Sequence, residues 1–263
     1  MKIVVCVKQV PDADASLSVN PEKTWIVETG INLEMNPYDR YALEEALKLK
    51  DVDSSHDVLA VAVGPERTSQ VLKTCLATGA DRAIHLKDPA FLDGDPWATA
   101  TALAAALRPE SPDLILCGMQ SDDGNMSQTP QIMAEILNLP HASGVMKLET
   151  GAEGLEVERE LEGDRREVLQ LPLPAVVSVQ TGINEPRYAS IKGIMAAKRK
   201  EMKVLAPQDI GLSPEQVGHA GSKIEFFDLK VPPRETSCEI LSGSTGEVAE
   251  ELVRRIREKT GLI

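Results

Sequence analysis

Short apolar runs alternate with amphipathic segments over the first half of the chain. Four runs are apolar on both faces, as central strands of a parallel sheet are, and they cover residues 2–8, 57–63, 82–86 and 113–117. Between the runs, Asx–Pro, Gly–Pro and Thr–Pro pairs predict helix starts at residues 36–37, 64–65, 95–96 and 129–130. This alternation predicts βαβ units with right-handed crossovers and a Rossmann-like α/β fold, a parallel sheet flanked by helices.

The pattern changes after about residue 139. Two segments of period 2, LEVEREL and REVLQLPL, flank Glu162-Gly163-Asp164 and predict a β-hairpin over about residues 154–172. AVVSVQ then predicts another buried strand. From residue 181 the chain is interrupted by proline and glycine, and a last amphipathic helix is expected at about residues 247–259. We therefore predict an α/β domain at residues 1–180 and an extended arm at 181–263 that packs on another molecule.

Composition and charge narrow the possible functions. The formal net charge is −13 and aromatic residues are only 3%, which disfavours a nucleic-acid or anionic-membrane binder and a base-stacking surface. No apolar stretch approaches the roughly 20 residues that a membrane span needs. Met1 leads directly into a predicted strand without signal-peptide features, so a cytoplasmic location is expected.

The residues that commonly bind metals or act in catalysis form no recognisable motif. The cysteines at positions 6, 75, 117 and 238 make no CxxC pair and are expected to be buried apolar residues in a reducing compartment. The histidines lack metal-ligand spacing, and His85, inside a predicted strand, is expected to be a core or edge histidine. GxGxxG, GxxxxGK[ST] and GxSxG are all missing from the sequence, which argues against a hydrolase with a local motif. No metal is expected.

The polar loop after the fourth predicted strand is the best candidate site. It runs from Gly118 to Thr129, at a strand's carboxyl end, and leads into a helix whose free N–H groups can receive a phosphate. The loop contains no Lys or Arg, which weighs against a triphosphate. A capped helix behind a polar surface loop explains the same residues as well, so the residues alone leave both interpretations open.

The start of the first predicted helix is a second candidate. Asn36, Pro37, Tyr38 and Asp39 can reach the same ligand, although an ordinary helix cap is the simpler interpretation of these four residues alone.

Seven segments, taken together, resemble the beta (small) subunit of electron-transfer flavoprotein. They are VCVKQVPD, MNPYDRYALEEALKLK, VAVGPE, LATGADRAIH, LILCGMQSDDGNMSQTPQ, LEVERELEG and, most specific, NEPRYASIKGIMAAKRK. The resemblance implies a heterodimer in which a larger alpha subunit holds most of the FAD site. This subunit would hold AMP, or a second FAD in the electron-bifurcating type. Electrons would pass from dehydrogenases, such as acyl-CoA dehydrogenases, to a membrane quinone oxidoreductase.

The resemblance also implies roles for individual residues. The nucleotide pocket carries over to Cys6, Asn36, Pro37, Tyr38, Asp39, Val63, Gly118, Gln120, Ser121, Asp122, Asp123, Gly124, Asn125, Met126, Ser127, Gln128 and Thr129. The partner-recognition loop carries over to Arg187, Tyr188, Ala189, Ser190, Ile191, Lys192, Gly193, Ile194, Met195 and Ala196, with Ile191 as the apolar anchor. Glu160 matches a glutamate that pairs with an arginine of the alpha subunit's flavin domain. Core packing of Ile191 and a solvated hairpin face for Glu160 remain alternatives.

The basic cluster Lys198, Arg199 and Lys200 lies beside the anchor and is expected to steer an acidic partner. The loop SDDGNMSQTPQ departs from both family types: Gly124 and Pro130 are closer to the bifurcating type, and Gln128-Thr129 is closer to the ordinary type. We expect the ordinary type, an electron carrier rather than an enzyme, with AMP in this subunit. The alternatives are a bifurcating component that oxidises NADH at its own FAD and a stand-alone nucleotide-binding regulatory protein.

Overall fold

A nine-stranded sheet forms the centre of the described part of the chain. The computed structural model describes residues 1–151, 154–233 and 238–261. The sheet order is β11-β5-β4-β1-β6-β10-β7-β8-β9, in which only the β7–β8 and β8–β9 pairs are antiparallel. The strands are β1 (Lys2–Cys6), β4 (Asp57–Val63), β5 (Arg82–Leu86), β6 (Leu114–Gly118), β7 (His141–Gly151), β8 (Gly154–Leu161), β9 (Arg165–Leu171), β10 (Ala175–Val179) and β11 (Met202–Leu205). The predicted Rossmann-like α/β fold is confirmed.

Helices cover both faces of this sheet. The four largest in its body are α1 (Pro37–Val52), α2 (Ser69–Thr78), α3 (Pro96–Leu107) and α4 (Thr129–Leu137). Alternate residues of β1 point to opposite faces: Ile3 packs with residues of α1 and α2, and Val4 packs with residues of α3 and α4. The predicted helix starts are confirmed, with one single turn of 3-10 helix, Glu66–Thr68, placed before α2.

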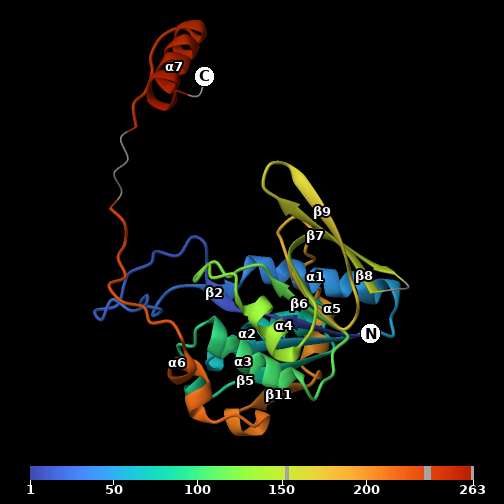
Figure 1. The fold of residues 1–263 in the computed structure, drawn as a ribbon. Helices are drawn as coiled ribbons and strands as arrows, with labels where there is room; N and C mark the ends of the chain where they lie inside the picture. The colour runs from blue at the N-terminus through green and yellow to red at the C-terminus, as the bar shows by residue number, and fades with distance from the viewer. Residues whose placement is uncertain (152–153, 234–237, 262–263) are drawn as a thin grey trace.

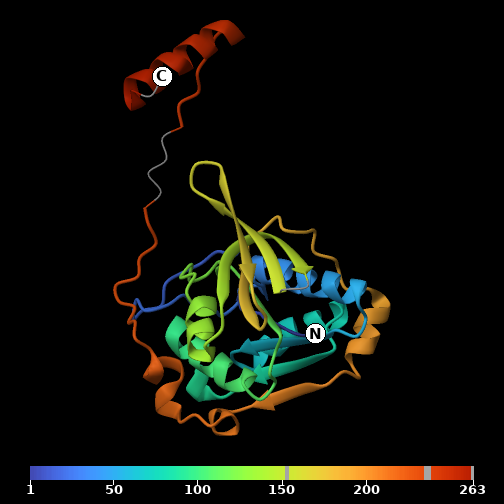
Figure 2. The same cartoon turned by 45° about the vertical axis from the view of Figure 1, so that its right-hand side comes forward.

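The predicted hairpin extends the sheet beyond its parallel part. β8 and β9 project away from the helices in both views (Figures 1 and 2). Leu155, Val157 and Leu171 keep the base of the hairpin in the core, while the side chains near its tip are exposed. A small ribbon of β2 (Gln9–Pro11) and β3 (Leu33–Met35), which the sequence analysis did not predict, lies between β1 and α1 in the chain.

After residue 180 the chain first adds an edge strand to the sheet and then extends away from the sheet. It forms α5 (Ile191–Ala197), the edge strand β11 beside β5, two 3-10 turns (Pro207–Ile210 and Pro214–Gln216) and the short α6 (Gly218–Gly221). The sequence analysis did not predict β11. The last helix, α7 (Thr245–Thr260), confirms the predicted helix and has no buried residue. In both views it stands apart from the sheet (Figures 1 and 2).

The order of strands reverses at β1, and this reversal locates the site. The chain passes from β1 to β4 and β5 on one side, and then to β6 and β10 on the other. In open α/β sheets, ligands bind outside the carboxyl ends of the strands at such a reversal. The carboxyl ends of β1 and β6 lie side by side here, because Cys6 and Cys117 are paired neighbours in the two strands.

Candidate functional site

The start of α1 is joined to the loop after β6 by the side chain of Asn36. Asn36 is only 1% exposed, and it donates from Nδ2 to the Gln120 carbonyl at 2.8 Å. Its Oδ1 accepts the Asp122 N–H at 3.1 Å. The expectation that Asn36 is an ordinary side-chain cap is therefore wrong: its amide makes no cap hydrogen bond and holds the loop instead.

Asp39 links the ends of the two central strands. One carboxylate oxygen accepts the Lys8 N–H at 2.7 Å, and the other accepts the Gly118 N–H at 3.1 Å. Burial raises the pKa of Asp39 from 3.8 to about 7, while these backbone hydrogen bonds act in the opposite direction. Gly118 must be a glycine here, since a Cβ at this position would lie 2.3 Å from Oδ1 of Asp39.

The loop itself is ordered by its own polar groups. Gln120 donates to the Tyr38 hydroxyl at 3.2 Å and accepts from the Ser127 hydroxyl at 3.1 Å. Asn125 and Ser127 adopt left-handed backbone conformations, with φ of 48° and 52°. The loop therefore folds back on itself before α4 begins, and no side chain caps the first turn of α4. Free backbone N–H groups at that turn can donate hydrogen bonds to an anionic ligand.

Lys8 is a site residue that the sequence analysis missed. Its Nζ lies 2.7 Å from Oδ1 of Asp123 and 3.4 Å from Oγ of Ser121. The side chain of Lys8 is 48% exposed, whereas that of Asp123 is 8% exposed. The loop has no cation in its own sequence, but the end of the neighbouring strand supplies one. The sequence feature that could have indicated Lys8 is its position directly after the first strand, at the edge where the loop was expected.

The structure brings the other predicted nucleotide-pocket residues to the same edge. Cys6 and Cys117 lie at the ends of adjacent strands, and a hydrogen bond with Cys6, together with burial, raises the pKa of Cys117. Val63 ends β4, the neighbour of β1. A buried thiol with a raised pKa is a poor nucleophile, so Cys117 is part of the wall of this edge. The remaining loop residues, Gly124, Met126, Gln128 and Thr129, continue from Asp123 to α4.

The predicted partner-recognition residues lie elsewhere, around α5. Tyr188, Ile191 and Met195 are 92%, 81% and 67% exposed, and Ile194 is also exposed. Ile191 is thus not a core residue. Ser190 caps α5 by accepting the Gly193 N–H at 3.0 Å. Ala189 and Ala196 flank these positions, and Lys192 is exposed. Arg187 points away from this surface, toward α1.

Two expectations about single residues need correction. Lys200 does not belong to an open basic cluster, because its Nζ donates to the carbonyls of Leu76 and Ala80 at 2.9 and 2.5 Å. Cys238 is exposed, unlike the three buried cysteines, because it lies in the extended segment before α7. Of the two expected positions for His85, core or edge, the structure shows the core: His85 is 1% exposed and its Nε2 lies 3.0 Å from the Gly64 carbonyl.

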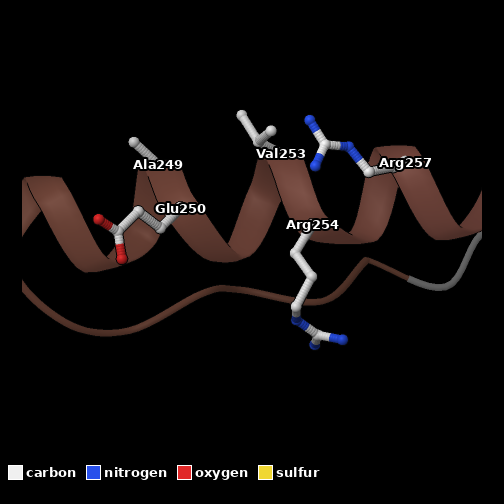
Figure 3. A pocket seen from close by; sticks show the side chains of 5 residues that line it. All are labelled: Ala249, Glu250, Val253, Arg254 and Arg257. Carbon is white, nitrogen blue, oxygen red and sulfur yellow. The ribbon is translucent and has the colours of Figure 1, made fainter. Parts of the chain in front are cut away.

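The hairpin and the last helix offer two further surfaces. Glu160 is exposed on β8, where it is the register partner of Arg166 on β9. A shallow hollow on α7 is lined by Ala249, Glu250, Val253, Arg254 and Arg257 (Figure 3). This hollow is formed by a single helix that stands apart from the sheet, and it is remote from the loop after β6 (Figure 1).

No group of three or more His, Cys, Asp or Glu residues in ranges 1–151, 154–233 and 238–261 is arranged to hold a metal ion. Across the same ranges, no helix combines the length and apolar character needed to cross a membrane.

Comparison with known proteins connects these features to one family. Residues 23–210 match the electron transfer flavoprotein domain. The chain is 36% identical to the caffeyl-CoA reductase-Etf complex subunit CarD of Acetobacterium woodii, over 98% of this chain and 99% of that protein. It is 35% identical to the human electron transfer flavoprotein subunit beta, over 98% and 97% of the two chains. The corresponding subunit of Methylophilus methylotrophus is 34% identical over 99% and 100%. The domain match and these full-length similarities together show that the chain belongs to the electron transfer flavoprotein family, as a beta subunit.

Proposed function

We propose that this chain is the beta subunit of a cytoplasmic, heterodimeric electron carrier of the ordinary type. Beta subunits of this family pair with an alpha subunit and carry electrons. In the proposed complex the alpha subunit holds most of the FAD site and this subunit holds an AMP. Electrons arrive from flavin dehydrogenases such as acyl-CoA dehydrogenases and leave to a membrane quinone oxidoreductase.

The observation that carries the proposal is the junction of α1 and the loop after β6. Asn36 and Asp39 hold that loop against the ends of β1 and β6, and the first turn of α4 keeps its backbone N–H groups without a side-chain cap. A single phosphate fits these donors, with Lys8 as the nearby cation. The carboxylates of Asp122 and Asp123 oppose the charge of a triphosphate. When AMP is bound it stabilises the fold by mass action.

The exposed face of α5 supports the partner role. Ile191 projects into solvent from a capped helix, which is a poor place for an aliphatic side chain unless a partner covers it. Full burial of such a side chain contributes about 2 kcal/mol or more to binding. Glu160 on the hairpin and the arm after residue 180 are proposed to contact the alpha subunit.

The nucleotide content of the purified heterodimer tests the proposal. Denaturation should release one FAD and one AMP per heterodimer. Ile191→Ala should slow electron uptake from an acyl-CoA dehydrogenase about thirtyfold, the change that corresponds to the lost ~2 kcal/mol, and leave the thermal transition unchanged. The proposal would be contradicted if denaturation released FAD but no AMP. It would also be contradicted if the Ile191→Ala variant took up electrons at the wild-type rate.

A second candidate is the electron-bifurcating type, in which this subunit binds a second FAD and oxidises NADH. Gly124 and Pro130 in the loop favour it, and one similar protein is named as a subunit of a caffeyl-CoA reductase-Etf complex. Two FAD per heterodimer, together with bleaching of the flavin absorbance by NADH, would establish this candidate in place of the first.

A further inference from the structure

The segment that carries the exposed face of α5 is tied to α1 by Arg187. The Arg187 backbone N–H donates to Oε2 of Glu44 at 3.0 Å, and its guanidinium contacts both oxygens of Glu44 at 2.8 Å. A second carboxylate, that of Asp51, lies 2.7 Å from Nη2. The side chain of Glu44 is only 7% exposed. This two-pronged pair fixes the orientation of the guanidinium as well as its position.

Asn184 ties the chain just before Arg187 to the same helix. Asn184 donates from Nδ2 to the Tyr41 carbonyl at 3.0 Å and to Oε2 of Glu45 at 2.9 Å. The entry to the segment is therefore held at two successive points along α1. A partner that recruited Arg187 would leave the carboxylate of Glu44 buried without its charge partner, which is costly.

The exit of the segment is tied to a different helix. Lys200 is partly buried, and its ammonium donates to the carbonyls of Leu76 and Ala80 at the carboxyl-terminal end of α2. A cation is favoured there by the helix dipole. Between the two ties, a Cβ on Gly193 would lie 2.1 Å from the Ala77 carbonyl oxygen. Only glycine lets α5 approach α2 this closely.

We propose that Arg187 and Lys200 are positioning residues, which hold residues 187–196 in a preformed docking shape and do not contact the dehydrogenase. The inference rests on the proposed partner role of that segment. Contact with the partner is left to the apolar side chains of Tyr188, Ile191 and Met195. Lys192, Lys198 and Arg199 are exposed and provide the positive charge that attracts an acidic partner.

Hydrogen exchange on the alpha–beta heterodimer measures the positioning directly. Arg187→Gln should raise exchange of the amides in residues 188–197 about tenfold. Asp51→Asn removes only the exposed carboxylate that contacts Arg187 and leaves Glu44 in place, so this variant should raise the exchange less. Gly193→Ala should also raise the exchange of these amides, although it changes no charged residue. Arg40→Gln is the matched control, because Arg40 lies on the same helix as Glu44 but pairs with Glu34 on β3 and leaves the segment untouched.

Electron transfer from an acyl-CoA dehydrogenase separates positioning from contact. Arg187→Gln should raise the KM for the heterodimer with little change in kcat, and Arg187→Lys should recover only part of the loss, because an ammonium cannot make the two-pronged contact. Lys198→Gln should weaken the dependence of the rate on salt without altering exchange.

The exchange and electron-transfer results together distinguish positioning from direct contact. Wild-type exchange in both Arg187→Gln and Gly193→Ala would overturn the proposal, whatever the electron-transfer rates. So would a raised KM in Arg187→Gln with unchanged exchange, since Arg187 would then contact the partner. Raised exchange in a heterodimer whose KM is unchanged by both Arg187→Gln and Ile191→Ala would uphold the positioning and reject the docking role of the segment.

Discussion

The buried carboxyl of Asp39 should make the stability of this chain depend on pH in an unusual direction. Burial raises the pKa of Asp39 from 3.8 to about 7. Between those values the folded chain keeps a proton that the unfolded chain has released. The contribution to the free energy of unfolding is therefore complete below pH 3.8 and is lost as the pH rises to about 7.

The size of the effect follows from the same two values. A difference of about three pKa units corresponds to about 4 kcal/mol, of which about 2.5 kcal/mol is lost between pH 5 and pH 8. Asp39→Asn removes the titration. Its amide can accept from only one of the two N–H groups of Lys8 and Gly118, so the variant should be less stable at pH 5 by about 1–3 kcal/mol.

Urea unfolding of the chain at several pH values between 5 and 8 tests this reasoning. The wild-type free energy of unfolding should fall more steeply with pH than that of Asp39→Asn. Asp113→Asn is the matched control, since exposed Asp113 accepts the Lys2 N–H at 2.7 Å at the opposite end of the same strand. Parallel pH profiles for the wild type and Asp39→Asn would show that burial does not hold a proton on Asp39.

Three further predictions concern the loop and the last helix. Gly118→Ala should lower the free energy of unfolding by about 2 kcal/mol and reduce AMP retention, because its Cβ would press on Asp39; a wild-type melting temperature would contradict it. Lys8→Gln should weaken AMP binding about fivefold in calorimetry with an unchanged fold, and equal affinities would exclude Lys8 from the site. Leu252→Glu, on the exposed apolar stripe of α7, should reduce heterodimer formation in size-exclusion chromatography and leave the isolated chain folded.

The sequence predicts those parts of the fold that local patterns determine. The central strands are apolar on both faces, and Asp95-Pro96 carries its own cap, which accepts the Ala98 N–H at 2.8 Å. β11 escapes prediction because it is a short edge strand whose Val204 is 48% exposed, so it has no buried-strand pattern. Its place depends on pairing with β5, which is distant in the sequence.

The candidate site was predictable in position but not in its connections. Strand ends and helix starts indicated the loop from Gly118 to Thr129, because parallel strands end at a common edge. The direction of a long side chain is decided by tertiary contacts, and no local pattern records it. The sequence analysis therefore did not predict that Lys8 pairs with Asp123 of the loop. Nor did it predict that the side chain of Arg187 points away from the recognition surface and contacts Glu44.

Helix α1 connects the proposed nucleotide site with the segment that carries α5. It carries three carboxyl groups that are at most 6% exposed, those of Asp39, Glu44 and Glu45. Buried carboxyl groups destabilise a fold unless each has a partner. Asp39 is paired with the backbone at the ends of β1 and β6, Glu44 with Arg187, and Glu45 with Asn184 and Lys48. The same helix therefore fixes the loop after β6 at its start and the segment before α5 further along, and a shift of α1 must disturb both.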